Sequence, residues 1–420
     1  MFIGRALIAM GVTVITARVV GPAGRGQIVL VTTVAGLVSL AASTGATVGI
    51  NEMRGVDRMD SPRLHTAGAL VSLLFSVPAS VVVAIVFRSN GGGGLSLAAV
   101  AALGVATVAL TVTAVAGQIA AHDDRLGAIT WTALAGAIAY ALVSAVTAVT
   151  DTMTVENNVA AWSVASLIPL ALLFRPARVI VFARDTNLAT AKRLAAHSLK
   201  ANIAGLAVLA IWRIDVVIVS ARRGFVELGQ YSIAVAVAEV VVVGAMGIRY
   251  AVMPHHTEDP TVLADVLTKV TRIGLVATTA LAVAVGVSAP LFIPAVFGSR
   301  FDGVAPALLL LLPGTVFLVL HYPLFDFLAA RGHLGKLTAL ASTALAFNVA
   351  ANWFVLGRTD FTAAAAISSV SYFAVFAATL VIVAAETGRP ISEFVRPRRD
   401  DVIVGRWGSD DKRPPSTVSE

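Results

Sequence analysis

Ionisable side chains inside long apolar stretches are the residues of this 420-residue sequence best suited to do chemistry. Five of them occur there: Arg5, Arg213, Asp215, Glu239 and Asp326. A charge at membrane depth costs at least about 2.5 kcal/mol and normally faces a partner or a water-filled cavity. These positions therefore predict either ion pairs or a polar site within the bilayer.

The arginines predict an anion-binding function. Arg5 and Arg18 are 13 residues apart, which on one helix is about 20 Å along the axis. A guanidinium group holds phosphate oxygens with two parallel hydrogen bonds. Cationic side chains this far apart suit a phosphate-bearing substrate that is passed from one leaflet to the other. Arg18 and Arg25 would bind it at the outer end of a cavity, and Arg5 would bind it near the inner end. We expect four arginines to bind substrate: Arg5, Arg18, Arg25 and Arg213. The alternative for Arg18 is a side chain at a helix end that extends to the membrane–water interface.

Three acidic residues, Asp215, Glu239 and Asp326, are candidates for ion coupling or gating. Asp326 follows Pro323, which can interrupt a helix and free backbone carbonyls, so its carboxylate could bind a proton or Na⁺. Arg213 and Asp215 are two residues apart and lie about 200° apart around a helix. At least one of them therefore faces another helix. The structural alternative is an ion pair of Arg213 with Asp215 or Glu239 across neighbouring spans.

The sequence lacks the signatures of a soluble enzyme. It has no cysteine, no Gly-x-x-x-x-Gly-Lys-Ser/Thr loop for ATP phosphates, and no spacing typical of metal ligands. Only 13% of the residues are charged and 57% are apolar, and the net charge of +7 is not gathered on a polar domain that could bind nucleic acid. We expect a protein that is not an enzyme, with no catalytic residue, metal, cofactor or nucleic-acid partner, and with coupling to H⁺ or Na⁺ left open.

Membrane-spanning helices must position these residues. About 20 apolar residues suffice for a helix to cross a bilayer. Twelve such stretches occur, at approximately 3–20, 27–50, 66–87, 95–117, 126–149, 158–174, 201–221, 229–252, 273–296, 304–329, 337–356 and 363–385. A cleavable signal peptide over residues 1–20 is the alternative for the first stretch. The predicted fold is an all-α, polytopic membrane protein with about 12 transmembrane helices.

The distribution of Lys and Arg predicts the orientation. With the N-terminus inside, the inner loops and tail hold 22 of these residues and the outer loops hold 7. Because cytoplasmic loops carry the excess of positive charge, both termini are expected in the cytoplasm.

Short strings recur at a nearly constant offset and predict two halves. Gly26-Gln27-Ile28 is matched 203 residues later by Gly229-Gln230-Tyr231, and LGAIT at 126–130 is matched by LGKLT at 334–338. An even number of spans per half gives both halves the same orientation, as in parallel-repeat transporters. The expected organisation is an N-terminal six-helix lobe (1–174), a cytoplasmic linker (175–200), a C-terminal six-helix lobe (201–385) and a disordered cytoplasmic tail (386–420).

Several motifs resemble a known family. The segment ARVVGPAGRG at 17–26 is similar to the opening motif of bacterial polysaccharide (O-antigen type) flippases of the multidrug/oligosaccharidyl-lipid/polysaccharide exporter superfamily. Arg213 and Asp215, followed by GQYSIA at 229–234, resemble that family's start of the second half. Phe297-Gly298 with Phe301, and Ala330-Arg331-Gly332, also fit. Family members have residues before the first span, so a start codon upstream of Met1 would fit the resemblance.

The resemblance implies two six-helix lobes around a central cavity and transport by alternating access. The substrate implied is an oligosaccharide linked to undecaprenyl pyrophosphate, moved to the outer leaflet of the bacterial cytoplasmic membrane for cell-surface polysaccharide biosynthesis. Membrane lipids, a polysaccharide polymerase and glycosyltransferases are the implied partners. Arg18, Arg213 and Asp215 are the residues that match the motifs. Twelve spans rather than fourteen argue against the peptidoglycan-precursor branch.

Two other functions are weighed against this one. A cation-coupled multidrug antiporter of the same superfamily predicts an acidic cavity, whereas the arginines here balance or outnumber the carboxylates. A membrane glycosyltransferase or polymerase needs a sizeable outer loop, and the longest predicted outer loop has about ten residues.

Overall fold

The computed structural model describes residues 2–55, 60–89, 95–123, 125–174, 189–196, 210–211, 213–252 and 260–398. The long elements in these ranges are α1 (Phe2–Gly55), α2 (Ser61–Ser89), α3 (Leu97–His122), α4 (Leu126–Val149), α5 (Val155–Phe174), α7 (Ile214–Val252), α8 (Pro260–Phe297), α9 (Val304–Ala330), α10 (Leu334–Val355) and α11 (Thr362–Thr387). Shorter elements include a single turn of 3-10 helix (Ser299–Phe301) and α12 (Ile391–Val395). Within the described ranges, ten helices are long and apolar enough to cross a membrane. The predicted all-α, polytopic fold is confirmed.

Two of these helices each contain a break at a glycine. Gly21 in α1 has φ 68° and ψ −174°, and Gly224 in α7 has φ 80° and ψ −175°. A positive φ is accessible to glycine without a steric penalty, and Pro22 then restarts the helix because its fixed φ suits a first helical position. α1 thus carries the first two predicted spans, and α7 carries the end of the seventh and the eighth. The two breaks are 203 residues apart, the same offset as the sequence repeat.

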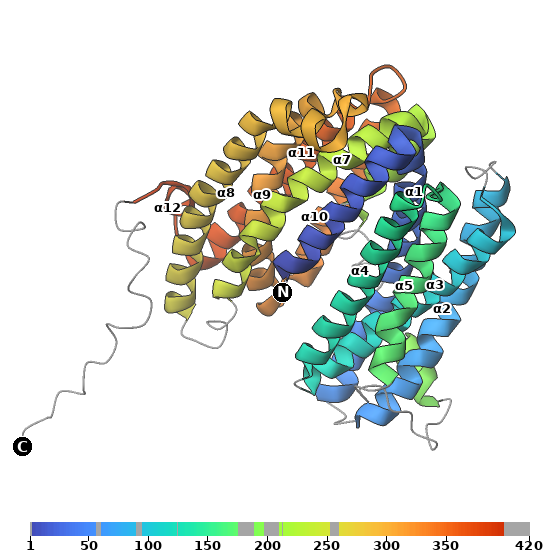
Figure 1. Cartoon of the computed structure of the whole chain (residues 1–420). Helices are drawn as coiled ribbons and strands as arrows, with labels where there is room; N and C mark the ends of the chain where they lie inside the picture. Colours follow the sequence, from blue (N-terminus) through green and yellow to red (C-terminus); the bar gives the residue numbers. More distant parts are fainter. Residues whose placement is uncertain are drawn as a thin grey trace, which may run out of the picture.

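The helices form two groups that meet at one end (Figure 1). The second segment of α1 packs with α2, α3, α4 and α5, while α7, α8, α9, α10 and α11 form the other group. α9 is apolar on all sides and contacts α7, α8 and α11, so it forms the centre of the C-terminal group. The first segment of α1 places Ala17 in the large C-terminal core, with Met10 and Val14 packed against it. This segment therefore lies between the groups, and its small and apolar residues join them.

The predicted linker, 175–200, contains a short helix at 189–196. Its Leu194 is fully buried against Ile50, Met53 and Leu64. The remainder of the predicted linker, 175–188 and 197–200, lies outside the described residues.

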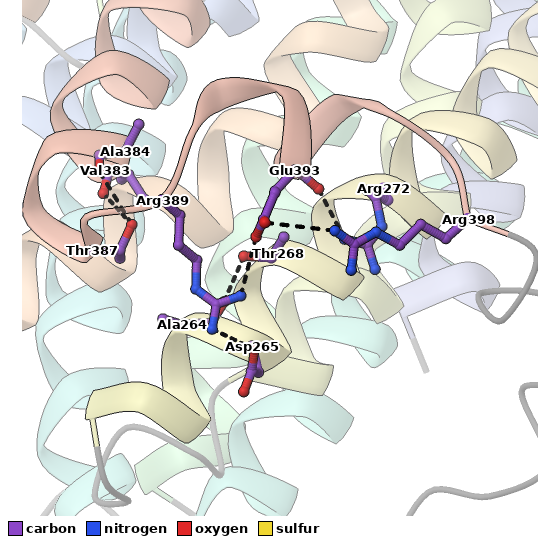
Figure 2. A network of polar contacts seen from close by, with 10 residues as sticks. All are labelled: Ala264, Asp265, Thr268, Arg272, Val383, Ala384, Thr387, Arg389, Glu393 and Arg398. Atoms are coloured by element: carbon purple, nitrogen blue, oxygen red, sulfur yellow. Dashed lines mark hydrogen bonds and ion pairs between the residues drawn. The ribbon is translucent and has the colours of Figure 1, made fainter.

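The predicted disordered tail is wrong for its first part, since residues 386–398 are ordered. Phe394 of α12 is fully buried in the C-terminal core. Arg389 forms ion pairs with Asp265 of α8 and with Glu393, and Arg272 of α8 donates a hydrogen bond of 2.9 Å to the Glu393 carbonyl (Figure 2). One apolar anchor and its ion pairs suffice to dock a polar segment, and a composition-based prediction does not detect them. Residues 399–420 lie outside the described part of the chain.

Candidate functional site

A cavity of about 590 Å³, lined by both charged and apolar side chains, lies between the two segments of α1, α5 and α7. Four charged residues line it: Arg5, Arg25 and Arg213 against Glu239. Three positive charges and one negative charge give the described lining a formal excess of +2. Because charges that line a cleft act together on whatever enters it, this excess favours the binding of anions.

Arg25 connects the two segments of α1. Its Nη1 donates to Thr16 Oγ1 and its Nη2 donates to Thr13 Oγ1, both at 3.2 Å. A guanidinium group has five N–H donors, and these two bonds use only part of that capacity. The Nε of Arg25 is buried without a hydrogen-bond partner. Arg25 therefore stabilises the α1 break while keeping donors for an anion in the cavity.

Arg213, directly before α7, forms an ion pair with Glu239, which lies on the second segment of α7 beyond the Gly224 break. The two side chains retain 35% and 45% of their exposure, so the pair is open to the cavity rather than sealed in the protein. Of the two partners that the sequence left open for Arg213, the structure selects Glu239. An anionic ligand that entered this cavity would meet Arg213 already paired, and would compete with Glu239 for it.

Asp215 is directed away from this cavity and is only 2% exposed. Its carboxylate accepts hydrogen bonds from the Tyr231 hydroxyl, from the Ser368 hydroxyl at 3.3 Å and from the backbone N–H of Val216 at 2.8 Å. Hydrogen bonds of this kind are what allows a carboxylate to remain buried. Asp215 is therefore held at the contact between α7 and α11.

A second cavity of about 220 Å³ lies beside Asp215. Tyr231, Tyr372, Thr315 and Asp215 line it together with apolar side chains, and Glu239 lines both this cavity and the larger one. Glu239 thus borders both the larger cavity, which we call the cationic cavity because its three arginines outnumber its one carboxylate, and the smaller cavity that contains the buried carboxylate of Asp215.

Arg18 lies outside both cavities. Its Nε donates to the Val296 carbonyl at 2.7 Å and its Nη2 donates to the Ala295 carbonyl, and Arg300 in turn donates to the Arg18 carbonyl at 2.9 Å. Carbonyls at the end of α8 have no partner within their helix, and a cation satisfies them well. The structure thus places the predicted substrate ligand Arg18 in a link between α1 and α8.

Asp326 is half-buried on α9 and lines neither of the two cavities. The structure therefore does not bring it together with Asp215 and Glu239. The other predicted residues fall into two sets, Arg5, Arg25, Arg213 and Glu239 around the larger cavity, and Asp215 with Glu239 around the smaller one.

The sequence analysis missed several polar and aromatic residues of these sites, among them Thr13, Trp162, Tyr231, Ser368 and Tyr372. Tyr231 lies within the motif GQYSIA and could have been found from it. Ser368 and Tyr372 lie in an apolar stretch 153 and 157 residues after Asp215, and nothing in their spacing pointed to that carboxylate.

Ten membrane-length helices among the described residues, arranged around a charged cavity, define the class of this protein as a multi-pass membrane protein. No family model and no curated relative matches the sequence. Solved structures do match. An inward-facing multidrug resistance MATE family transporter of the MOP superfamily aligns with a TM-score of 0.72 and 14% identity over 91% of this chain and 94% of that one.

The lipid II flippase MurJ in an inward closed conformation aligns with a TM-score of 0.74 and 10% identity over 93% of this chain and 87% of its own. The Vibrio cholerae MATE transporter VcmN in its bent form aligns with a TM-score of 0.58 and 10% identity over 94% and 96%. This chain therefore shares its fold with solved MATE and MurJ structures.

Proposed function

We propose that this protein is a flippase that moves a lipid-linked oligosaccharide, carried on undecaprenyl pyrophosphate, across the bacterial cytoplasmic membrane for cell-surface polysaccharide biosynthesis. The observation that carries the proposal is the charge of the larger cavity, where Arg5, Arg25 and Arg213 outnumber Glu239. A pyrophosphate group needs several guanidinium donors at once. A cavity for cationic drugs would require the opposite excess.

In this proposal, transport proceeds by alternating access. The fold is more similar to an inward-facing MATE structure (TM-score 0.72) than to an outward-facing one (0.55). With both termini in the cytoplasm, as the Lys and Arg distribution predicts, the larger cavity would receive substrate from the inner leaflet. Closing the inner ends of the two groups and opening the crossing of α1 and α7 would then expose it to the outer leaflet.

Coupling to H⁺ or Na⁺ would involve Glu239 and Asp215. An incoming pyrophosphate would compete with Glu239 for Arg213, and the released carboxylate would gain affinity for a cation. Asp215 lies across the second cavity from the same group. Binding of substrate and binding of a cation would thus be linked through one side chain.

Cation-coupled multidrug antiport is the second candidate function. It is favoured by the similarity to a multidrug resistance MATE transporter over 91% of this chain. It requires a cationic drug to occupy a cavity whose described lining has an excess of positive charge, which opposes binding.

Reconstitution of the purified full chain into proteoliposomes tests the proposal. We expect inner-to-outer movement of an undecaprenyl-pyrophosphate-linked oligosaccharide, and at least a tenfold lower rate after Arg25→Ala or Arg213→Ala. Arg358→Ala is the matched control, because Arg358 is exposed and lies outside the cavity. Efflux of a cationic dye by the wild type, without movement of the lipid-linked oligosaccharide, would establish the antiporter instead.

A further inference from the structure

Among the described residues that line the cationic cavity, Trp162 of α5 is the one with an aromatic side chain. It packs on one side against the N-terminal cluster that contains Ile28, Val31 and Val159. Another part of its surface lines the cavity. A large indole that is anchored on one side loses little further entropy when a ligand covers the other.

Trp162 lies at an intermediate depth among the arginines. Gly24 packs against Val155, where an added Cβ would be 3.2 Å from Val155 Cγ2, so Arg25 is level with the start of α5. Trp162 follows Val155 by seven residues, or about 10 Å along the helix. The Gly224 break is level with Arg25, because a Cβ on Gly26 would be 2.0 Å from the Phe225 carbonyl oxygen. Arg213 precedes this break by eleven residues, or about 16 Å. The indole therefore stands between the levels of Arg25 and Arg213.

Four hydroxyl side chains contribute to the same cavity wall. Thr13, Thr32, Thr33 and Ser232 line the cavity together with Trp162. The face of an aromatic ring is electronegative and attracts the weakly positive C–H groups on the flat side of a sugar ring, while hydroxyls and guanidinium groups bond to the sugar's own hydroxyls. Thr32 and Ser232 already donate to carbonyls of their own helices, but their oxygens can still accept hydrogen bonds from a sugar, which an isoprenoid chain cannot supply.

We propose that Trp162 is a stacking platform for a sugar residue next to the pyrophosphate, so that the cavity recognises the glycan as well as the phosphate. This inference rests on the proposed function and deepens it. With the pyrophosphate at Arg213, a sugar one or two bonds away would reach the level of Trp162. The residue would then select glycosylated carriers over the bare lipid.

Binding of two lipid probes to the full-length reconstituted protein tests this inference. One probe is undecaprenyl pyrophosphate without sugar, and the other is the same lipid carrying an oligosaccharide. We expect Trp162→Ala to weaken binding of the glycosylated probe about tenfold and to change binding of the bare probe less than twofold. Trp162→Phe should restore most of the loss, because a smaller aromatic face remains.

Trp131→Ala is the matched control, since Trp131 lies on α4 of the same group and is 66% exposed outside the cavity. Equal losses for both probes would show that Trp162 only supports the wall, and no loss for either would also overturn the platform. A wild-type protein that binds both probes equally would overturn the platform while leaving the proposed function intact. Failure of the wild type to bind either probe would overturn both.

Discussion

Gly26 and Gly229, 203 residues apart in the chain, lie in the same crossing of α1 and α7, and each faces the backbone of the other helix. A Cβ on Gly26 would be 2.0 Å from the Phe225 carbonyl oxygen, and a Cβ on Gly229 would be 1.9 Å from the Pro22 carbonyl oxygen. The relationship is reciprocal, as expected for two halves related by a repeat. Absence of a side chain at these two positions allows the helices to approach closely enough to close one end of the cavity.

Substitution of these glycines should force the crossing apart. We expect Gly26→Ala and Gly229→Ala each to destabilise the folded protein by about 3 kcal/mol, because rigid backbone on both sides cannot move away cheaply. Thermal unfolding in detergent measures the effect. Gly36→Ala is the control, since a Cβ there meets nothing within 4 Å. Identical unfolding midpoints for Gly26→Ala and Gly36→Ala would contradict the close approach.

Removing the charge of Glu239 should free Arg213. We expect Glu239→Gln to tighten binding of undecaprenyl pyrophosphate about tenfold, because the ligand no longer competes with a carboxylate for the guanidinium group. Equilibrium binding to the reconstituted protein measures this change. In the double variant with Arg213→Gln, the gain should disappear. A gain that persists without Arg213 would show that Glu239 acts through general electrostatics and not through the ion pair.

Asp215→Asn should abolish coupling of transport to an H⁺ or Na⁺ gradient while leaving substrate binding nearly unchanged. The amide keeps an acceptor for the Tyr231 and Ser368 hydroxyls but cannot bind a proton or hold a cation by charge. We expect substrate affinity within threefold of the wild type and loss of the stimulation that an imposed H⁺ or Na⁺ gradient gives in proteoliposomes. Asp302→Asn, at an exposed position outside both cavities, is the control. Gradient stimulation that survives Asp215→Asn would remove Asp215 from the coupling mechanism.

The docked C-terminal segment predicts a sharp limit for truncation. Phe394 is fully buried against the α8 side of the C-terminal group, so Phe394→Ala should destabilise the protein by about 3 kcal/mol. Deletion of residues 399–420 should leave the unfolding midpoint unchanged, and deletion of residues 389–420 should lower it by several degrees. The ion pairs of Arg389 in Figure 2 would be lost only in the longer deletion. Equal midpoints for both truncations would show that α12 adds no stability.

Much of the fold could be predicted because its signals are local. Apolar stretches long enough to span a bilayer identified the helices. The offset of 203 residues that separates Gly26 from Gly229 also separates the breaks at Gly21 and Gly224, which the sequence analysis did not predict. Arg5 and Arg213 could also be singled out, because charge in an apolar stretch requires a polar environment wherever the helix lies.

The partners of these groups were decided by the tertiary structure. Arg18 and Arg25 are seven residues apart, yet one bonds to the end of α8 and the other faces the cavity, because the break at Gly21 places them on different segments. Arg213 pairs with Glu239 while Asp215 turns to Tyr231 and Ser368. Sequence determines which residues must avoid lipid, since hydropathy is a property of each residue and its neighbours in the chain. Helix rotation and crossing decide which distant side chains meet, and only the packing of whole helices sets these two quantities.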